Sequence, residues 1–142
     1  MTQLTEVQAA YLAGLFDGEG CITVDTTKDR LIISIGGNDP RVAGAFKEVF
    51  GGSVLTQENP NRQHFGFKWR AAGKRAGAIL SILEPHLKVK KSQARLGVAV
   101  AGLTGLPGKH LSPLHSGWKP LRVRILRKIQ YLNQHPPKWV KC

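Results

Sequence analysis

Two carboxylates, Asp17 and Glu19, are separated by a single residue. They stand where a helix of small and apolar residues is expected to end, just before Gly20. They close the nine-residue stretch Leu-Ala-Gly-Leu-Phe-Asp-Gly-Glu-Gly at positions 12–20. The unpaired carbonyls of a helix C-terminus are already partly negative, so acidic side chains there cost stability unless a cation lies against them. A local rule that is broken without structural gain usually marks a functional site. The pattern therefore indicates a site that holds a cation.

The same predicted helix carries small residues, Ala13, Gly14 and Gly18, where a bulky face would be expected. Small residues allow two helix backbones to approach closely. Two copies of the chain crossing at a two-fold axis would use this property, and they would bring both Glu19 carboxylates together. A close contact within one copy of the chain would use the same residues. The helix alone leaves both interpretations open.

The positions of apolar and capping residues predict two αββ units in succession, followed by further helices. The first helix begins near Glu6, behind a capping box formed by Thr5 and Gln8, and ends at the Gly18/Gly20 pair. Strands are expected at 21–27, 31–35, 53–57 and 64–70, and helices at 40–50, 74–87, 92–103 and 120–133, with a Gly/Pro-rich loop at 105–117.

Four short strands that each have one apolar face predict an α+β fold, in which an antiparallel four-stranded sheet packs on helices in the order αββαββα. We expect one domain over residues 1–142. Its core covers about 5–103, and a basic helical extension covers about 104–142.

The face of the sheet that points away from the helices is expected to be polar and basic. Arginine and lysine can bind guanine edges in the major groove, hydroxyl groups can bind either base, and carboxylates can accept from cytosine. An ordinary solvated face uses the same residue types, so the alternation alone leaves both interpretations open. The predicted DNA-facing residues are Thr23, Asp25, Thr27, Arg30, Ser34, Thr56, Glu58, Arg62, His64, Lys68 and Arg70.

The charge of the chain, +12, is concentrated in its second part. Residues 1–84 hold nine Lys/Arg and all nine Asp/Glu, whereas residues 85–142 hold twelve Lys/Arg and no acid. Such a segment favours a polyanionic partner, although a merely basic soluble surface is the alternative. No apolar run is long enough for a membrane span, so no membrane partner is expected. Two cysteines are too few for a disulfide framework, which favours a reducing, intracellular location in an organelle or a bacterial or phage cytoplasm.

Positions 12–20 resemble the signature helix of the LAGLIDADG homing endonucleases. The residues that match letter for letter are Leu12, Ala13, Gly14, Leu15, Asp17 and Gly20. The αββαββα order is similar to the whole domain of that family over roughly residues 5–103. The resemblance implies a homodimeric, sequence-specific endonuclease for double-stranded DNA that uses Mg²⁺, with Mn²⁺ as another suitable ion. It implies a long, pseudo-palindromic site, cleavage across the minor groove with short 3′ overhangs, and promotion of insertion of the enzyme's own coding element.

The resemblance also implies roles for individual residues. Glu19 would bind the metal together with the Gly18 carbonyl. Asp17, also counted among the catalytic residues, would order the end of the helix by hydrogen bonding and act on the metal only indirectly. The segment 87–93 is similar to one that provides an active-site lysine, which by position is Lys90, with Lys88 as the second choice. The alternative is that this basic run, including Lys91, only touches phosphates.

Two departures from the family pattern bear on catalysis. The second carboxylate is most often aspartate, and Glu19 reaches further. The glutamine that organises water after the second strand is missing; Asn38 is an imperfect substitute, and Asp39 is better explained as a helix cap. One alternative is therefore a DNA- or RNA-binding protein of this fold without cleavage, such as an intron maturase or a regulator. The other alternative is a basic RNA-binding structural protein, in which the motif is a coincidence.

Overall fold

The helices and strands follow one another in the predicted order. The computed structural model describes residues 4–58, 65–103 and 118–135. Its elements are α1 (Glu6–Glu19), β1 (Gly20–Asp25), β2 (Arg30–Gly37), α2 (Pro40–Phe50), β3 (Val54–Glu58), β4 (Phe65–Ala72), α3 (Gly73–Leu83), the 3₁₀ turn η1 (Glu84–His86), α4 (Lys91–Leu103) and α5 (Trp118–Gln134). The α+β fold class is thus confirmed, with small changes at element ends. The helix predicted over 74–87 ends at Leu83, and the strand predicted over 21–27 ends at Asp25.

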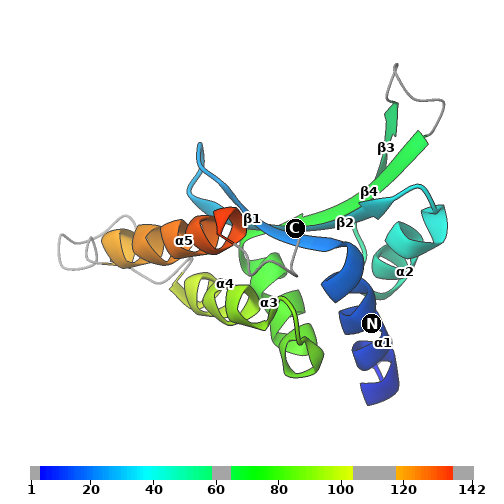
Figure 1. The fold of residues 1–142 in the computed structure, drawn as a ribbon, viewed down its shortest axis with the longest axis horizontal. Helices are drawn as coiled ribbons and strands as arrows, with labels where there is room; N and C mark the ends of the chain where they lie inside the picture. Colours follow the sequence, from blue (N-terminus) through cyan, green and yellow to red (C-terminus); the bar gives the residue numbers. More distant parts are fainter. Residues whose placement is uncertain (1–3, 59–64, 104–117, 136–142) are drawn as a thin grey trace.

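The sheet is antiparallel, with strand order β1-β2-β4-β3. Helices α1, α2, α3 and α4 lie on one side of it, and the described part of the chain places no helix over the other face (Figure 1). We call this second face the outer face. Because antiparallel partners point to the same side, the register fixes which residues share it.

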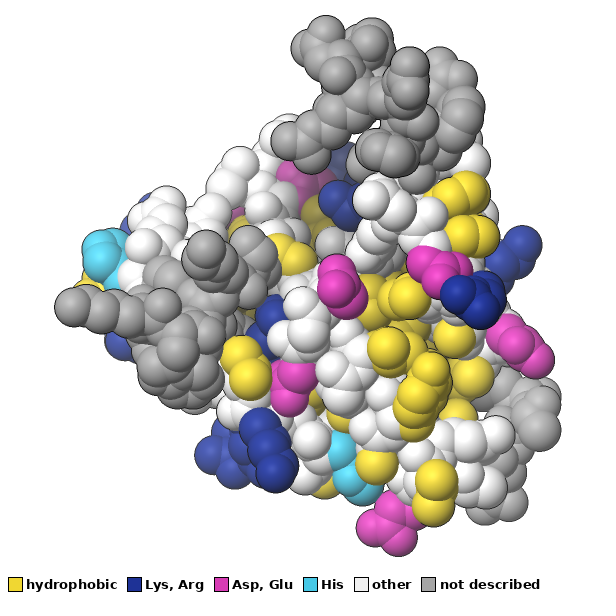
Figure 2. Space-filling model, turned by 45° about the vertical axis from the view of Figure 1, so that its right-hand side comes forward, with side chains coloured by type: hydrophobic (Ala, Val, Ile, Leu, Met, Phe, Trp, Pro, Cys, Tyr) yellow, Lys and Arg dark blue, Asp and Glu magenta, His cyan; other side chains and the backbone are white. Residues whose placement is uncertain are grey.

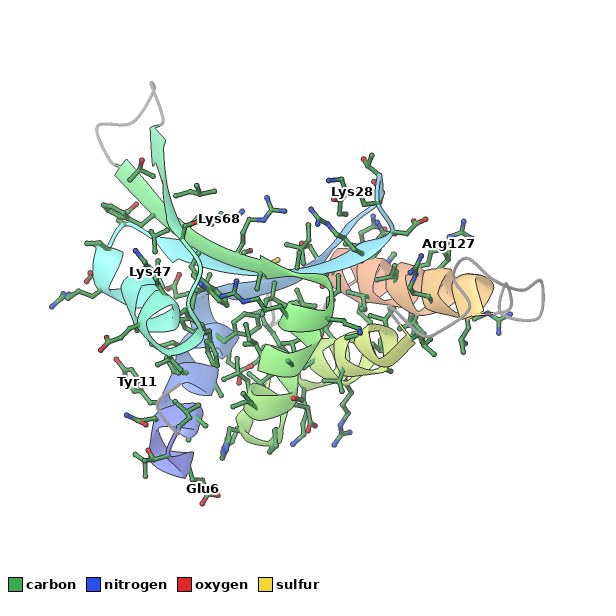
Figure 3. The ribbon with its side chains drawn as sticks, turned by 180° about the vertical axis from the view of Figure 1, so that it is seen from behind. Glu6, Tyr11, Lys28, Lys47, Lys68 and Arg127 are labelled. Carbon is green, nitrogen blue, oxygen red and sulfur yellow. The ribbon has the colours of Figure 1, made fainter. Side chains whose placement is uncertain are left out.

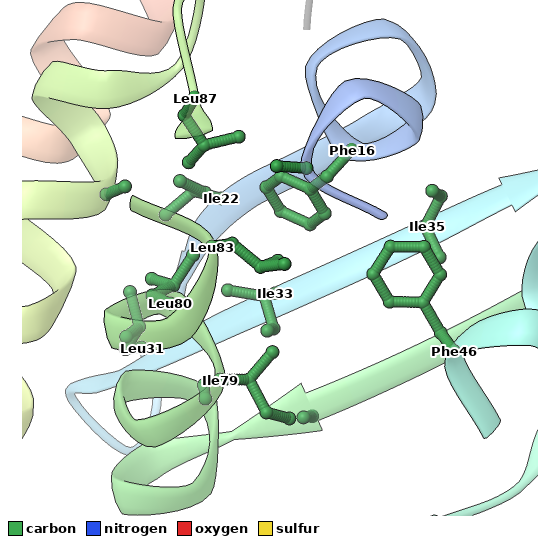
Figure 4. Packing of buried hydrophobic residues seen from close by; sticks show 14 of the residues in the cluster. Phe16, Ile22, Leu31, Ile33, Ile35, Phe46, Ile79, Leu80, Leu83 and Leu87 are labelled. Carbon is green, nitrogen blue, oxygen red and sulfur yellow. The ribbon is translucent and has the colours of Figure 1, made fainter. Parts of the chain in front are cut away.

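The core lies between the sheet and the helices, and aromatic side chains fill it at the α2 end. The rings of Phe16, Phe46 and Trp69 are fully buried and in contact, with centroids 6.2 Å apart for the first pair and 5.2 Å for the second. Figure 4 shows how α1, α2 and α3 bring their buried side chains onto β1 and β2. A Cβ at Gly20 would overlap the ring of Phe16. The glycine that follows the two carboxylates is therefore required by packing.

Local capping determines where α1 and α2 begin, as predicted. The N–H of Gln8 donates to Thr5 Oγ1 at 3.1 Å, and the N–H of Thr5 donates to Gln8 Oε1 at 3.0 Å. Asp39 caps α2 by accepting from the N–H of Arg41 at 2.9 Å, and its carboxylate also binds the Arg41 guanidinium. These contacts satisfy N–H groups that have no partner within the helix.

Helix α5 braces the edge of the sheet at β1. Its Leu126 and Ile129 are buried in the common core, and it packs against α4 and β1. The side-chain amide of Asn133 donates to the carbonyl of Ile22 at 2.6 Å. The described part of the C-terminal extension is thus an integral part of the domain.

None of the helices in the described ranges combines the length and hydropathy of a membrane span.

The ion pair at the start of α2 predicts a pH dependence of stability. The Arg41 guanidinium and N–H hold the pKa of Asp39 at about 2, below the ordinary 3.8. A lowered folded-state pKa gives stability that is present above pH 3.8 and is lost as the pH falls towards about 2. Asp39→Asn keeps a good cap but removes the charge. The melting temperature of this variant should lie below that of the parent chain at neutral pH and should converge with it near pH 2.

Asp29→Asn is the matched control, because Asp29 lies in the β1–β2 turn with φ of 48°, a conformation that asparagine tolerates. A difference between Asp39→Asn and the parent chain that stays constant down to pH 2 would show that the ion pair does not stabilise α2.

Candidate active site

Asp17 and Glu19, at the end of α1, have different surroundings. Asp17 accepts two backbone hydrogen bonds from a distant segment: from the N–H of Lys88 at 2.7 Å and from the N–H of Lys90 at 3.0 Å. It therefore ties the end of α1 to the chain that leads into α4, and it makes the ordering hydrogen bonds expected of it. Glu19 is exposed.

Lys90 is the buried cation at this helix end. Its side chain is only 2% exposed, and its Nζ donates to the carbonyl of Asp17 at 2.7 Å. Burial lowers the pKa of Lys90, while the negative charges of Asp17 and Glu19 act in the opposite direction. A positive charge against a helix C-terminus is favourable, because the terminal carbonyls are partly negative. The sequence pattern predicted positive charge at this helix end, and a lysine of the protein itself supplies part of it.

The exposed oxygens at the end of α1 suit a hard divalent cation. The Glu19 carboxylate and the carbonyl of the exposed Gly18 are the kind of donors that Mg²⁺ prefers. The N–H of Gly20 closes the helix by donating to the carbonyl of Phe16. Among the described residues, no group of three or more His, Cys, Asp or Glu could hold a metal ion. The end of α1 therefore presents oxygen donors of this kind without a preformed metal cluster in the described part of the chain.

One face of α1 is exposed, and its second half carries only glycines. Nothing lies within 4 Å of a Cβ built at Gly14 or at Gly18, and the side chains of Val7 and Tyr11 are 80% and 65% exposed. These four residues lie on one side of the helix, three or four positions apart. Val7 and Tyr11 also line a groove of about 460 Å³ between α1 and α2, whose other lining residues are mostly hydrophobic (Figure 2).

The prediction of Ala13 as an interface residue is wrong in this structure. Ala13 is fully buried in the core of its own domain, so it has no surface to offer a second copy. Successive helical positions point in directions about 100° apart, and this turns Ala13 inwards while Gly14 faces out.

The outer face carries six of the predicted DNA-facing residues. The register pairs Asp25 with Arg30, Ser34 with Arg70, and Gly36 with Lys68. Arg70 is exposed and Lys68 is half-buried, and Figure 3 shows Lys68 on the side of the sheet away from Glu6 and Tyr11. Ser34 is only 7% exposed and has little surface to offer a ligand. The residues placed on this face are Thr23, Asp25, Arg30, Ser34, Lys68 and Arg70.

For β3, the sequence prediction placed the side chains on the wrong sides of the sheet. Thr56 pairs with Phe67, which lies next to the helices, so Thr56 faces the helix side. Position 58 pairs with Phe65, in the same phase. Leu55 pairs with Lys68 instead and lies on the outer face, half exposed, where the sequence reasoning missed it. The adjacent apolar residues Val54 and Leu55 gave no clear alternation, and only the pairing with β4 determines the phase.

The structure does not place the remaining predicted DNA-facing positions on the outer face. Thr27 lies in the turn after β1, where its N–H donates to Asp25 Oδ1 at 3.0 Å. Arg62 and His64 lie outside the described residues, as does the side chain of Glu58.

Asp25 is held by its own hairpin. Burial raises its pKa, but the N–H groups of Lys28 and Thr27 and the side chain of Arg30 together lower it below its ordinary value. The Arg30 Nε lies 3.3 Å from Asp25 Oδ2. A carboxylate occupied in this way has little capacity left to accept from a cytosine, so its role here is to shape the turn.

Comparison with known proteins finds one family model and a set of solved structures that the chain resembles. Residues 6–54 match the model of the LAGLIDADG-like domain. No curated protein matches the chain significantly in sequence. Among solved structures, the homing endonuclease I-CvuI in complex with its target superposes with a TM-score of 0.69 at 17% identity, covering 96% of this chain and 87% of that one.

Two more structures show how much of each relative the chain spans. The archaeal intron-encoded homing endonuclease I-Vdi141I, complexed with DNA, gives a TM-score of 0.68 at 18% identity and is covered to 88%, with 96% of this chain aligned. The LAGLIDADG homing endonuclease I-GzeII, in complex with its DNA target, gives 0.65 at 13% identity; 99% of this chain covers 51% of that one. Residues 6–54 are thus similar to the LAGLIDADG-like domain, and the chain has the fold of the LAGLIDADG homing endonucleases, which confirms the resemblance first indicated by the motif.

The contacts of Asp17 predict a local effect of removing its charge. In Asp17→Asn only one side-chain oxygen remains to accept, so one of the two N–H groups loses its partner. Amide hydrogen exchange at Lys88 and Lys90 should become faster and the melting temperature should fall, because a hydrogen bond to a charged group contributes about 1.5–3 kcal/mol.

Glu19→Gln is the matched control for this prediction. It removes a carboxylate two positions further on that opposes the helix dipole and is exposed, so it should leave the melting temperature unchanged or raise it slightly. Equal destabilisation by both substitutions would contradict the assignment of the anchoring role to Asp17 alone.

Proposed function

We propose that the chain is a sequence-specific endonuclease for double-stranded DNA that acts as a homodimer with divalent metal ions. The observation that carries the proposal is the arrangement at the end of α1. The exposed carboxylate of Glu19 lies beside a buried cation, Lys90, which Asp17 holds in place, next to the open helix face of Gly14 and Gly18. A structural role in the isolated chain explains Asp17 but not Glu19.

The open face of α1 supports pairing of two copies. Glycines with free space beside them permit close helix contact, and Val7 and Tyr11 extend the face with apolar surface. A two-fold axis through this face would bring the two α1 C-termini, and with them both Glu19 residues, to one place. The half-length coverage of I-GzeII supports the same conclusion, because this chain corresponds to about half of that one.

Glu19 and the Gly18 carbonyl are the residues that would hold the metal, with Mg²⁺ or Mn²⁺ as the suitable ions. I-CvuI structures contain target DNA in the presence of Ca or Mg, which supports the choice of a divalent cation. When bound, such an ion activates water and neutralises charge on the phosphate and the leaving oxygen. Lys90 supplies a positive charge close to Glu19, and the hydrogen bond from its Nζ to the carbonyl of Asp17 holds it there.

The outer face is the surface proposed to read DNA. It presents Arg70 and Lys68, which can bind guanine edges, and two copies of it would read a long site with approximate two-fold symmetry. Lys88 is exposed and Lys91 is half-buried at the start of α4, close to the Asp17 anchor, which suits contact with phosphates near the reacting bond.

A second candidate is a protein of the same fold that binds a nucleic acid without cutting it. Its support comes from the end of β2, where the family's water-organising glutamine is missing. Asn38 is exposed there, and Asp39 is committed to capping α2. Incubation of DNA carrying the target with Mg²⁺, and in parallel with EDTA, separates the two candidates.

The first prediction from the proposal concerns Glu19. Glu19→Gln should abolish cleavage of target DNA in Mg²⁺, because an amide does not neutralise a metal ion. Binding of the same duplex should stay within about tenfold of the parent chain, because the outer face is unchanged. Retained cleavage would refute the metal-ligand assignment, and loss of binding together with cleavage would place Glu19 in recognition instead. The target itself is found by selecting cleaved sites from a randomised duplex pool.

The second prediction concerns recognition by the outer face. Arg70→Ala should relax preference at particular base pairs, by about 1–3 kcal/mol if the contact to guanine is bidentate. Lys47→Ala is the matched control. It also removes one exposed positive charge, but from α2, which lies in the helix layer and not on the outer face (Figure 3). A uniform loss over all sequences for Arg70→Ala would show that this residue touches only phosphate.

A further inference from the structure

Helix α5 is held firmly at the edge of the sheet, yet much of its surface is unused by the fold. Leu126 and Ile129 face the core, and Asn133 binds the carbonyl of Ile22 on β1. On the outward side, Arg124 and Arg127 are exposed. The position of these arginines relative to β1 is therefore determined by buried contacts.

The positive charge of α5 is not neutralised within the described part of the chain. The helix contains five Lys/Arg and no Asp/Glu over its 17 residues. The ion pairs of the described residues lie elsewhere and join Arg30 to Asp25, Arg41 to Asp39, and Arg95 to Glu84. Clustered charge of one sign costs stability through self-repulsion, so a partner of opposite charge is favoured at this surface.

The orientation of α5 connects this charge to the outer face. Figure 3 shows Arg127 on the same side of the molecule as Lys28 and Lys68, and opposite to Glu6 and Tyr11. Lys28 lies in the turn between β1 and β2, beside the edge that α5 covers. Arg124 precedes Arg127 by three residues and is therefore its neighbour on the helix surface. A basic strip thus continues from the outer face, past β1, onto α5.

We propose that α5 is an additional DNA-contacting element, in which Arg124 and Arg127 bind backbone phosphates of the duplex just beyond the segment covered by the sheet. This inference rests on the proposed function, since it takes the outer face to be the surface that binds DNA. Contacts to phosphate fix position and contribute affinity without reading bases, so α5 lengthens the bound segment and leaves base preference unchanged.

The test is the salt dependence of binding to a fluorescent mixed-sequence duplex of about 40 base pairs, long enough for both surfaces to be covered. Because two copies bind one duplex in the proposed dimer, Arg124→Gln and Arg127→Gln each remove two phosphate contacts and should each lower the slope of log K against log[salt] by about 1.8, and the double variant by about twice as much. Lys47→Gln, with the same charge loss on α2, should leave the slope unchanged. Thermal melting of each variant checks that α5 remains docked, as expected for exposed side chains.

The outcomes separate this inference from the proposed function. If Lys68→Gln lowers the slope but the α5 variants behave like Lys47→Gln, α5 does not contact DNA, and the endonuclease proposal is unaffected. If the variants of the outer face and of α5 all leave the slope unchanged, both proposals are wrong. If an α5 variant changes base preference in the cleavage selection, α5 reads bases, and its assignment as a phosphate contact is wrong.

Discussion

The carboxylate of Asp17 holds together the two parts of the chain from which the site is built. It accepts from backbone N–H groups that are 71 and 73 residues away in sequence, and so joins the end of α1 to the segment before α4. The same junction lets the Nζ of Lys90 reach the carbonyl of Asp17. Without it, neither Lys90 nor Lys88 would have a fixed position relative to Glu19.

This junction refines the electrostatic argument that the motif suggests. Two acids at a helix C-terminus require positive charge nearby, and the protein itself provides part of it through buried Lys90 and the N–H donors on Asp17. Asp17 is thereby explained without a metal ion. Glu19 is exposed and accepts neither of these backbone hydrogen bonds. The motif thus divides into an anchoring acid, Asp17, and an exposed acid, Glu19, which is the metal ligand in the proposed function.

Features set by local sequence could be predicted, and those set by pairing between distant segments could not. The capping box at Thr5, the Asp39 cap and the order of elements follow from neighbouring residues, and the structure has all three. The phase of β3 depends on its register with β4, so Thr56 was placed on the wrong face and Leu55 was missed. Ala13 and Gly14 are both small, and only packing in three dimensions shows that the first is buried and the second is open.

The central claim is that the site becomes complete only when two copies of the open α1 face meet. The most direct test is the mass of the complex with a duplex carrying the cleaved site, measured for the parent chain and for Gly18→Leu. Gly44→Leu on α2 is the control, since a Cβ there also has nothing within 4 Å. We expect two chains per duplex for the parent chain and for Gly44→Leu, and we expect Gly18→Leu to fail to form this two-chain complex. One chain per duplex for the parent, or an intact pair in Gly18→Leu, would contradict it.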